Sequence, residues 1–138
     1  MFHQLGVRHA CISPGARNSP LTFAFTERSE IKCFSHADER SSAFFALGLA
    51  KSTLKPVVLI CTSGTAGANY FPAVIEASLG RVPIIIVTAD RPKYFVGTGA
   101  NQTINQQNLF GIHVRFFFDV GLPEKDHKIL QNKIESAF

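Results

Sequence analysis

The sequence lacks any apolar run long enough to cross a membrane, and it contains few cysteines. A spanning helix needs about 20 consecutive apolar residues. No stretch of this chain approaches that length, and its first residues lack the charged and then apolar segments of a secretory signal. Cysteine occurs three times, at Cys11, Cys33 and Cys61, each inside an apolar, strand-like run. This odd number favours reduced, packed thiols over a disulfide framework or a metal site. We therefore expect a cytoplasmic protein with no membrane span and no metal ligands of its own.

Concentrated basic charge is also missing. The formal net charge is +4, but the Lys and Arg residues are scattered along the chain and form no basic run. This pattern argues against a nucleic-acid partner. Neither G-x-G-x-x-G nor G-x-x-x-x-G-K-[ST] occurs, so the nucleotide-binding motifs are absent too.

What is present is the composition of a folded domain. The chain has 138 residues, of which 46% are hydrophobic and only 17% are charged. This length is enough to bury one sizeable core, and this composition excludes disorder. We therefore expect residues 1–138 to form a single domain.

Short β-branched or aromatic runs alternate with segments of helical periodicity, which is typical of βαβ units. The sequence predicts a three-layer α/β fold, in which helices cover both faces of an open, mostly parallel sheet. The third and fourth strands are apolar throughout and are expected to be central. Residues 90–108 should form a long polar loop. The predicted strands are 7–12, 31–35, 57–62, 83–88 and 114–120, and the predicted helices start at Ser19 or cover 39–52, 65–80 and 129–134.

Polar and unusual residues follow the first four predicted strands. Because ligands gather at the carboxyl ends of parallel strands, these segments should meet at one edge of the sheet. Each segment also has a simple structural explanation: Glu39 suits any helix start, and Gly64 could merely allow close packing. The four segments are 13–20, 36–40, 62–67 and 88–92.

Taken together and in this order, six segments resemble the N-terminal, pyrimidine-binding domain of the 2-succinyl-5-enolpyruvyl-6-hydroxy-3-cyclohexene-1-carboxylate synthase family. The resemblance covers residues 6–119. Members of this family are thiamine diphosphate enzymes of menaquinone biosynthesis. The six segments are Ser13-Pro14-Gly15-Ala16-Arg17-Asn18-Ser19-Pro20-Leu21, Asp38-Glu39-Arg40-Ser41, Ala46-Leu47-Gly48-Leu49-Ala50-Lys51, Cys61-Thr62-Ser63-Gly64-Thr65-Ala66, Thr88-Ala89-Asp90-Arg91-Pro92 and Gly99-Ala100-Asn101-Gln102.

The resemblance implies a role for each matching residue. Glu39 would be the catalytic acid that hydrogen-bonds the cofactor pyrimidine and shares a proton with it. Substrate would contact Arg17 and Arg91, with Gln102 and the neighbouring Asn101 as neutral partners. Ala16 replaces the serine usual in this family and so removes one hydroxyl donor. The implied cofactor-binding residues are Glu39, Pro14, Gly15, Thr62, Ser63 and Gly64.

The resemblance also implies partners that lie outside these residues. The substrates would be 2-oxoglutarate, which is decarboxylated, and isochorismate, to which the product carbanion is added. A second domain, with a Gly-Asp-Gly segment that this sequence lacks, would hold the diphosphate and Mg²⁺ or Mn²⁺. A homodimer or homotetramer would complete each site, so the chain alone should be inactive.

Two alternatives remain open at this stage. One is another thiamine diphosphate enzyme, of the acetolactate synthase or oxo-acid decarboxylase type. The other is a noncatalytic α/β module that binds a nucleotide or mediates assembly.

Overall fold

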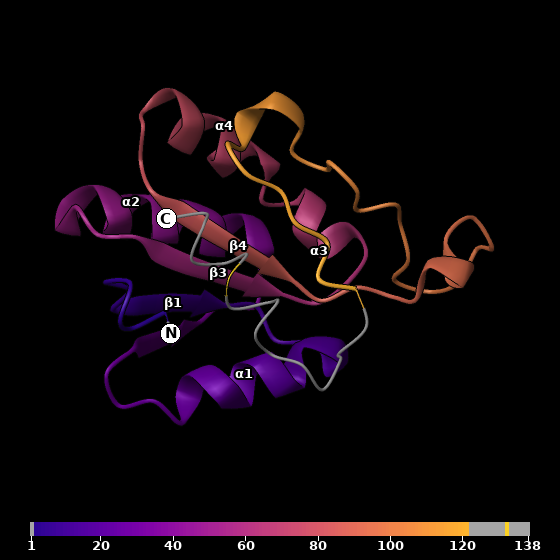
Figure 1. Cartoon of the computed structure of the whole chain (residues 1–138), viewed down its shortest axis with the longest axis horizontal. Coiled ribbons are helices and arrows are strands. Elements are labelled where there is room, and N and C mark those ends of the chain that lie inside the picture. The colour runs from indigo at the N-terminus through magenta and orange to yellow at the C-terminus, as the bar shows by residue number, and fades with distance from the viewer. Residues whose placement is uncertain (1, 122–131, 133–138) are drawn as a thin grey trace.

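The computed structural model of the chain describes residues 2–121 and residue 132. Its centre is a four-stranded sheet in the order β2-β1-β3-β4 (Figure 1). All three strand pairs are parallel, which confirms the predicted α/β class. The strands are β1 (His9–Ile12), β2 (Lys32–Ser35), β3 (Val57–Cys61) and β4 (Ile84–Thr88).

Strand β3 is central, as predicted, because it pairs with both β1 and β4 and all five of its residues are buried. The prediction for β4 was wrong. This strand forms an edge of the described sheet, and its residues are only half-buried. An apolar run reports burial against the layers above and below a sheet, and it does not report the position of the strand within that sheet.

The predicted fifth strand was also wrong. Residues 114–120 form no strand in the described part of the chain, and Phe116, Phe117 and Val120 are exposed. Strand propensity measures how well a residue suits a pleated, half-buried surface, and such a surface also requires an adjacent strand.

The helices begin where the local sequence predicts. Pro20 lies in the first turn of α1, and the Asp38 carboxylate caps α2 by accepting a hydrogen bond from the Ser41 backbone N–H at 2.6 Å. The predicted helix 65–80 is divided in two, because Pro72 restricts the backbone before it and starts a new helix. The helices are η1 (Ala16–Asn18), α1 (Ser19–Thr26), α2 (Glu39–Thr53), α3 (Thr65–Ala68), α4 (Phe71–Leu79), η2 (Lys93–Phe95) and η3 (Gly111–His113).

Residues 90–108 form the expected long loop, with only the short η2 within it. Of the predicted helix 129–134, only residue 132 is described, and it is helical. None of the helices in the described residues is both long and apolar enough to cross a membrane.

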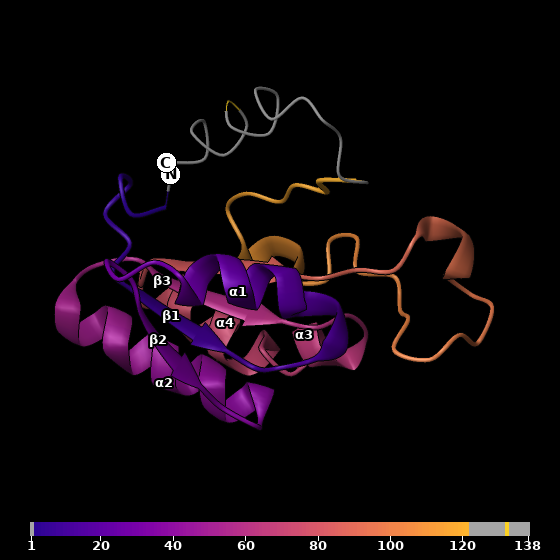
Figure 2. The ribbon, with the colours of Figure 1, turned by 90° about the horizontal axis from the view of Figure 1, so that it is seen from below.

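Two apolar cores lie on opposite faces of the sheet. The alternation of β3 sends Leu59 and Cys61 toward α2 and α4, and sends Val58 and Ile60 toward α1. Figure 2 shows the sheet between α1 on one side and α2 on the other. The predicted three layers are therefore confirmed. The alternation also determines to which face of the sheet each residue at the end of a strand points.

Candidate functional site

The four loops that follow the strands begin side by side at the carboxyl ends of the strands, and we call this border the edge of the sheet from here on. The backbone N–H of Ser13 donates to Ile60 O at 2.8 Å, and that of His36 donates to Ile12 O at 3.0 Å. The Ala89 N–H donates to Cys61 O at 3.0 Å. These bonds continue the parallel ladders beyond the strands, so the predicted site segments share a common starting point.

The loop after β1 is folded against the loop after β3. Asn18 is fully buried, and its side-chain amide donates to Ser13 O at 3.0 Å. A Cβ added to Gly15 would lie 2.5 Å from Thr62 Cβ. Only glycine allows this approach, which brings the backbone at Gly15 close to Thr62.

The loop after β3 also holds a distant segment of the chain. The Ser63 hydroxyl donates to Gln102 O at 2.8 Å. A Cβ on Gly64 would lie 2.8 Å from Gln102 Cα, and Gly64 has a φ of +81°, which favours glycine. The backbone at Gln102 is therefore fixed against the edge of the sheet, although it lies in the long loop.

An open pocket of about 350 Å³ lies at this edge. Its lining includes two arginines, Arg17 and Arg91, and none of the described lining residues is acidic. Guanidinium groups bind carboxylates through paired, charge-assisted hydrogen bonds, so this pocket suits an anionic ligand. The lining residues are Ala16, Arg17, Pro20, Arg91 and Gln102.

The structure thus brings together Ala16, Arg17, Arg91 and Gln102, four of the residues predicted to contact substrate. Asn101 is exposed and does not line this pocket. The Nε atom of Arg91 is buried without a hydrogen-bond partner in the described residues.

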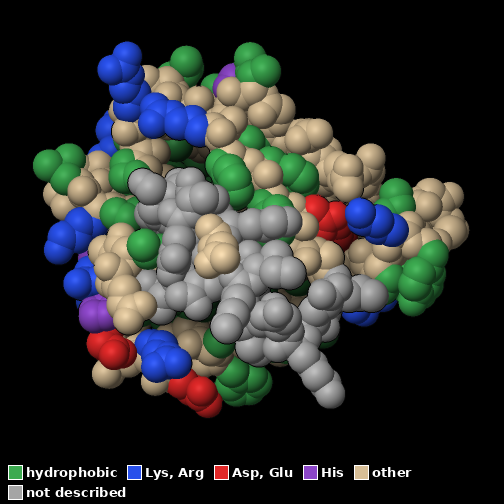
Figure 3. Space-filling model, viewed as in Figure 1, with side chains coloured by type: hydrophobic (Ala, Val, Ile, Leu, Met, Phe, Trp, Pro, Cys, Tyr) green, Lys and Arg blue, Asp and Glu red, His purple; other side chains and the backbone are tan. Residues whose placement is uncertain are grey.

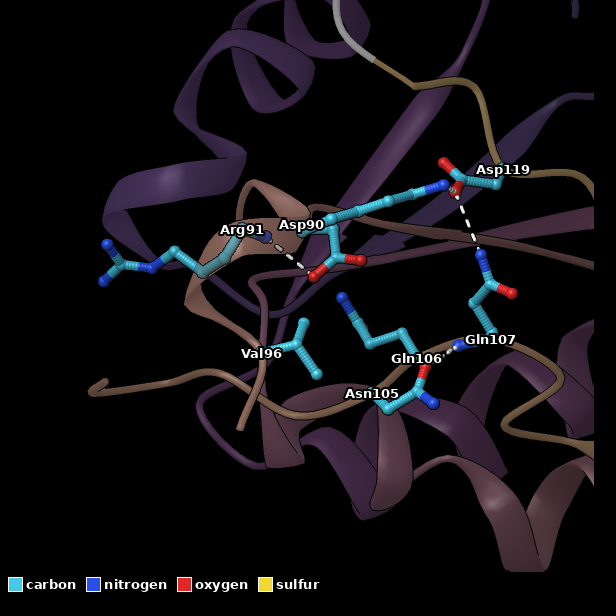
Figure 4. A pocket seen from close by; sticks show the side chains of 8 residues that line it. Asp90, Arg91, Val96, Asn105, Gln106, Gln107 and Asp119 are labelled. Carbon is cyan, nitrogen blue, oxygen red and sulfur yellow. Dashed lines mark hydrogen bonds and ion pairs between the residues drawn. The ribbon is translucent and has the colours of Figure 1, made fainter. Parts of the chain in front are cut away.

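A second, smaller pocket of about 200 Å³ lies beside the first and was not predicted from the sequence. Figure 4 shows Arg91 extending its guanidinium group away from Gln107 and Asp119. Asp119 forms an ion pair with Lys93 at 3.1 Å, and its pKa is lowered by the Gly121 backbone N–H and then by Lys93. The lining residues are Asp90, Arg91, Lys93, Val96, Asn105, Gln106, Gln107 and Asp119.

Glu39 is the first residue of α2 and is half-buried at the same edge of the sheet. Its charge reaches the α2 face of the sheet, where it helps to raise the pKa values of Cys61 and Tyr70. Burial is the larger cause in both cases, and it raises the pKa of the Cys61 thiol to about 12. Glu39 lines neither of the two pockets.

The neighbours of Glu39 have mainly structural roles. Asp38 caps α2, and the hydrogen bond from Ser41 lowers the pKa of its carboxyl. His36 is half-buried and packs on Phe45, with ring centroids 4.8 Å apart. On the face shown in Figure 3, the Lys and Arg side chains form several separate groups.

A family model described as "Thiamine pyrophosphate enzyme, N-terminal TPP binding domain" matches residues 1–109. The chain belongs to this family. The resemblance inferred from the sequence is confirmed by curated relatives that are 2-succinyl-5-enolpyruvyl-6-hydroxy-3-cyclohexene-1-carboxylate synthases. The protein of Lysinibacillus sphaericus is 57% identical over 121 residues, which are 88% of this chain and 21% of the relative. That of Haloarcula marismortui is 54% identical over 121 residues, covering 88% of this chain and 20% of the relative.

A solved structure has the same fold. Benzoylformate decarboxylase from Polynucleobacter necessarius superposes with a TM-score of 0.77 at 19% sequence identity, over 99% of this chain and 25% of that one. At this identity the likeness concerns the fold alone. The chain spans about a fifth of the length of its curated relatives.

Proposed function

We propose that residues 1–138 are the pyrimidine-binding domain of a 2-succinyl-5-enolpyruvyl-6-hydroxy-3-cyclohexene-1-carboxylate synthase. The complete enzyme would decarboxylate 2-oxoglutarate and add the resulting carbanion to isochorismate in menaquinone biosynthesis. The observation that carries this proposal is the convergence of Arg17, Arg91 and Gln102, from two distant loops, on one pocket. The high identity to the synthases supports it.

The residues at the edge of the sheet fit thiamine diphosphate. Gly15 and Gly64 let the loops pack closely against Thr62 and Gln102, and the buried Thr62 hydroxyl has no partner in the described residues. When bound, the cofactor supplies a thiazolium carbon that loses a proton and can carry the substrate carbanion. Glu39 would hold the shared proton between its carboxyl oxygen and the pyrimidine nitrogen, and so act as an acid and a base in turn. The backbone of Pro14, Gly15, Thr62, Ser63 and Gly64 would bind the pyrimidine.

Substrate would bind through its carboxylates. Arg17 is exposed and Arg91 is half-buried, so both side chains are accessible to an anion. Both substrates carry two carboxylates, which match two guanidinium groups better than pyruvate would. This pairing favours the synthase over enzymes of the acetolactate synthase or oxo-acid decarboxylase type. Asn101 would supply a further hydrogen bond, and Ala16 would provide none.

The diphosphate and Mg²⁺ or Mn²⁺ would be held by another domain. No group of three or more His, Cys, Asp or Glu residues in the described part of the chain could hold a metal ion. We expect that domain to come from a partner subunit in a homodimer or homotetramer. The free thiols of Cys11, Cys33 and Cys61 favour a cytoplasmic location.

The decisive test is Glu39→Gln in the full-length enzyme. Glutamine has the same shape but cannot share the proton, so turnover should fall by about 10² to 10⁴-fold while the thermal midpoint stays unchanged. Glu30→Gln makes the same chemical change at an exposed position before β2 and should leave turnover as it is. Near-normal turnover by the Glu39→Gln enzyme would refute the proposed role.

A further inference from the structure

The long loop of residues 90–105 carries two residues of the pocket proposed for substrate, Arg91 near its start and Gln102 near its end. The two are held in different ways. The backbone at Gln102 is fixed by the Ser63 hydroxyl and by the close approach of Gly64. In the described part of the chain, no hydrogen bond or ion pair holds the Arg91 side chain, and its Nε atom is buried without a partner. The position of the Arg91 guanidinium group therefore depends on the backbone that precedes it.

That backbone is fixed on two sides at Ala89, two residues before Arg91. The Ala89 N–H donates to Cys61 O at 3.0 Å, and the Ala89 carbonyl accepts a hydrogen bond from the side-chain Nε2 of Gln106 at 3.0 Å. Because a carbonyl oxygen can only accept, the amide nitrogen of Gln106 is the atom that faces it. Gln106 directly follows the loop, so this hydrogen bond joins the two ends of the loop and closes it at its base.

Packing alone does not explain an amide at position 106. Gln106 is 7% exposed, and its Oε1 atom is buried without a partner in the described residues. The side chain fills a narrow space, since a Cβ added to Gly67 would lie 3.4 Å from that oxygen and 3.2 Å from Thr88 Cγ2. An apolar side chain of the same length would fill this space without burying an unpaired carbonyl oxygen, which costs free energy. What only the amide provides is the hydrogen bond to Ala89.

Gln106 acts on Arg91 through the backbone and not by direct contact. Arg91 lines both pockets, whereas Gln106 lines only the smaller one and does not reach the pocket proposed for substrate. Figure 4 shows the Arg91 side chain extending away from Gln106. The link between them is the hydrogen bond to Ala89 and the two residues of chain that follow it.

We propose that Gln106 is a positioning residue for Arg91. Its amide fixes the Ala89 carbonyl and so determines where the guanidinium group meets a substrate carboxylate. This inference rests on the proposed function, because it presumes that Arg91 binds substrate. Loss of the hydrogen bond should weaken substrate binding and leave the activation of the cofactor unaffected.

The test compares Gln106→Met with Arg91→Lys in the full-length enzyme. Arg91→Lys keeps the charge and loses the paired hydrogen bonds, so it shows for which of 2-oxoglutarate and isochorismate Arg91 determines KM. Methionine matches the length of glutamine and has no N–H donor. Gln106→Met should raise KM for that same substrate by about 10-fold, because a small displacement of a binding group is costly. Gln107→Met makes the same change at the exposed neighbouring position and should leave both KM values unchanged.

Two further measurements distinguish positioning from a purely structural role. Added to Arg91→Lys, Gln106→Met should raise KM little further, because both changes then act on one interaction. Deuterium exchange at the thiazolium carbon of the bound cofactor should keep its wild-type rate in Gln106→Met. A purely structural role would instead lower the thermal midpoint and leave KM unchanged.

A wild-type KM in folded Gln106→Met, or a rise of undiminished size in the Arg91→Lys background, would overturn the inference while the proposed function stands. If Gln106→Met does not fold, Gln106→Asn decides in its place, because its amide is one methylene shorter and cannot reach Ala89 O. A raised KM for the same substrate then supports the inference, and an unchanged KM refutes it. If Arg91→Lys itself leaves both KM values unchanged, the substrate role of Arg91 in the proposed function fails, and this inference fails with it.

Discussion

Asp38 and Glu39 are adjacent acids that the structure places in different surroundings. Asp38 lies just before α2 and accepts a hydrogen bond from the Ser41 N–H, whereas Glu39 is half-buried and reaches the α2 face of the sheet. Acids at a helix start are common for purely structural reasons. Here Asp38 satisfies that requirement and leaves Glu39 free for chemistry.

The cap at Asp38 should make stability depend on pH. Its pKa in the folded chain lies below the ordinary value of 3.8, so its contribution is complete above that value and is lost as the pH falls through the lowered pKa. Asp38→Asn keeps the accepting oxygen but cannot ionise, and Asp38→Ala removes the cap. By urea unfolding, we expect the wild type to be most stable and the alanine variant least stable at neutral pH. The wild type should converge on Asp38→Asn in acid, and a constant difference between them across the pH range would contradict this assignment.

At the scale of elements, replacing glycine by alanine should have opposite effects on stability at two positions. Gly15→Ala would place a Cβ 2.5 Å from Thr62 Cβ, whereas a Cβ on Gly48, in the exposed face of α2, meets nothing within 4 Å. We expect Gly15→Ala to lower the free energy of unfolding by about 1 to 3 kcal/mol. Gly48→Ala should raise it by roughly 0.5 to 1 kcal/mol, because alanine restricts the unfolded chain and favours helix. Chemical denaturation of both variants checks this, and equal effects would rule out close packing between the two loops.

The elements that the sequence predicted well are those with local signals. Three such signals act on residues close to them in the chain. They are the apolar run of β3, Pro20 at the start of α1 and the Asp38 cap of α2. The errors concern relations between distant residues. Whether 114–120 pairs with a strand, and whether β4 lies at an edge, depends on the rest of the sheet.

The same division applies to the candidate site. The parallel topology brings the loops with Arg17 and Arg91 to one edge, so their convergence could be predicted from the order of strands and helices. The contact of Gly64 with Gln102 could not, because it depends on the path of a long loop.

At the scale of the whole molecule, the proposed function assigns to this chain one side of a shared site. Its described residues offer two arginines, a half-buried acid and a glycine-lined edge, but no cluster of ligands for a metal ion. Most of the binding energy for a diphosphate comes from its charge and its metal ion, so the pyrimidine side alone should bind very weakly.

The 138-residue chain should therefore show no detectable turnover and no tight binding when thiamine diphosphate and Mg²⁺ are added together. Titration calorimetry of the chain, with the full-length enzyme as the positive control, measures this directly. The heat should be no larger with Mg²⁺ than without it, because the described residues include no group of three or more His, Cys, Asp or Glu that could hold a metal ion. Tight, metal-dependent binding by the chain alone would contradict the proposed division of the site, since it would require a diphosphate and metal site within these residues.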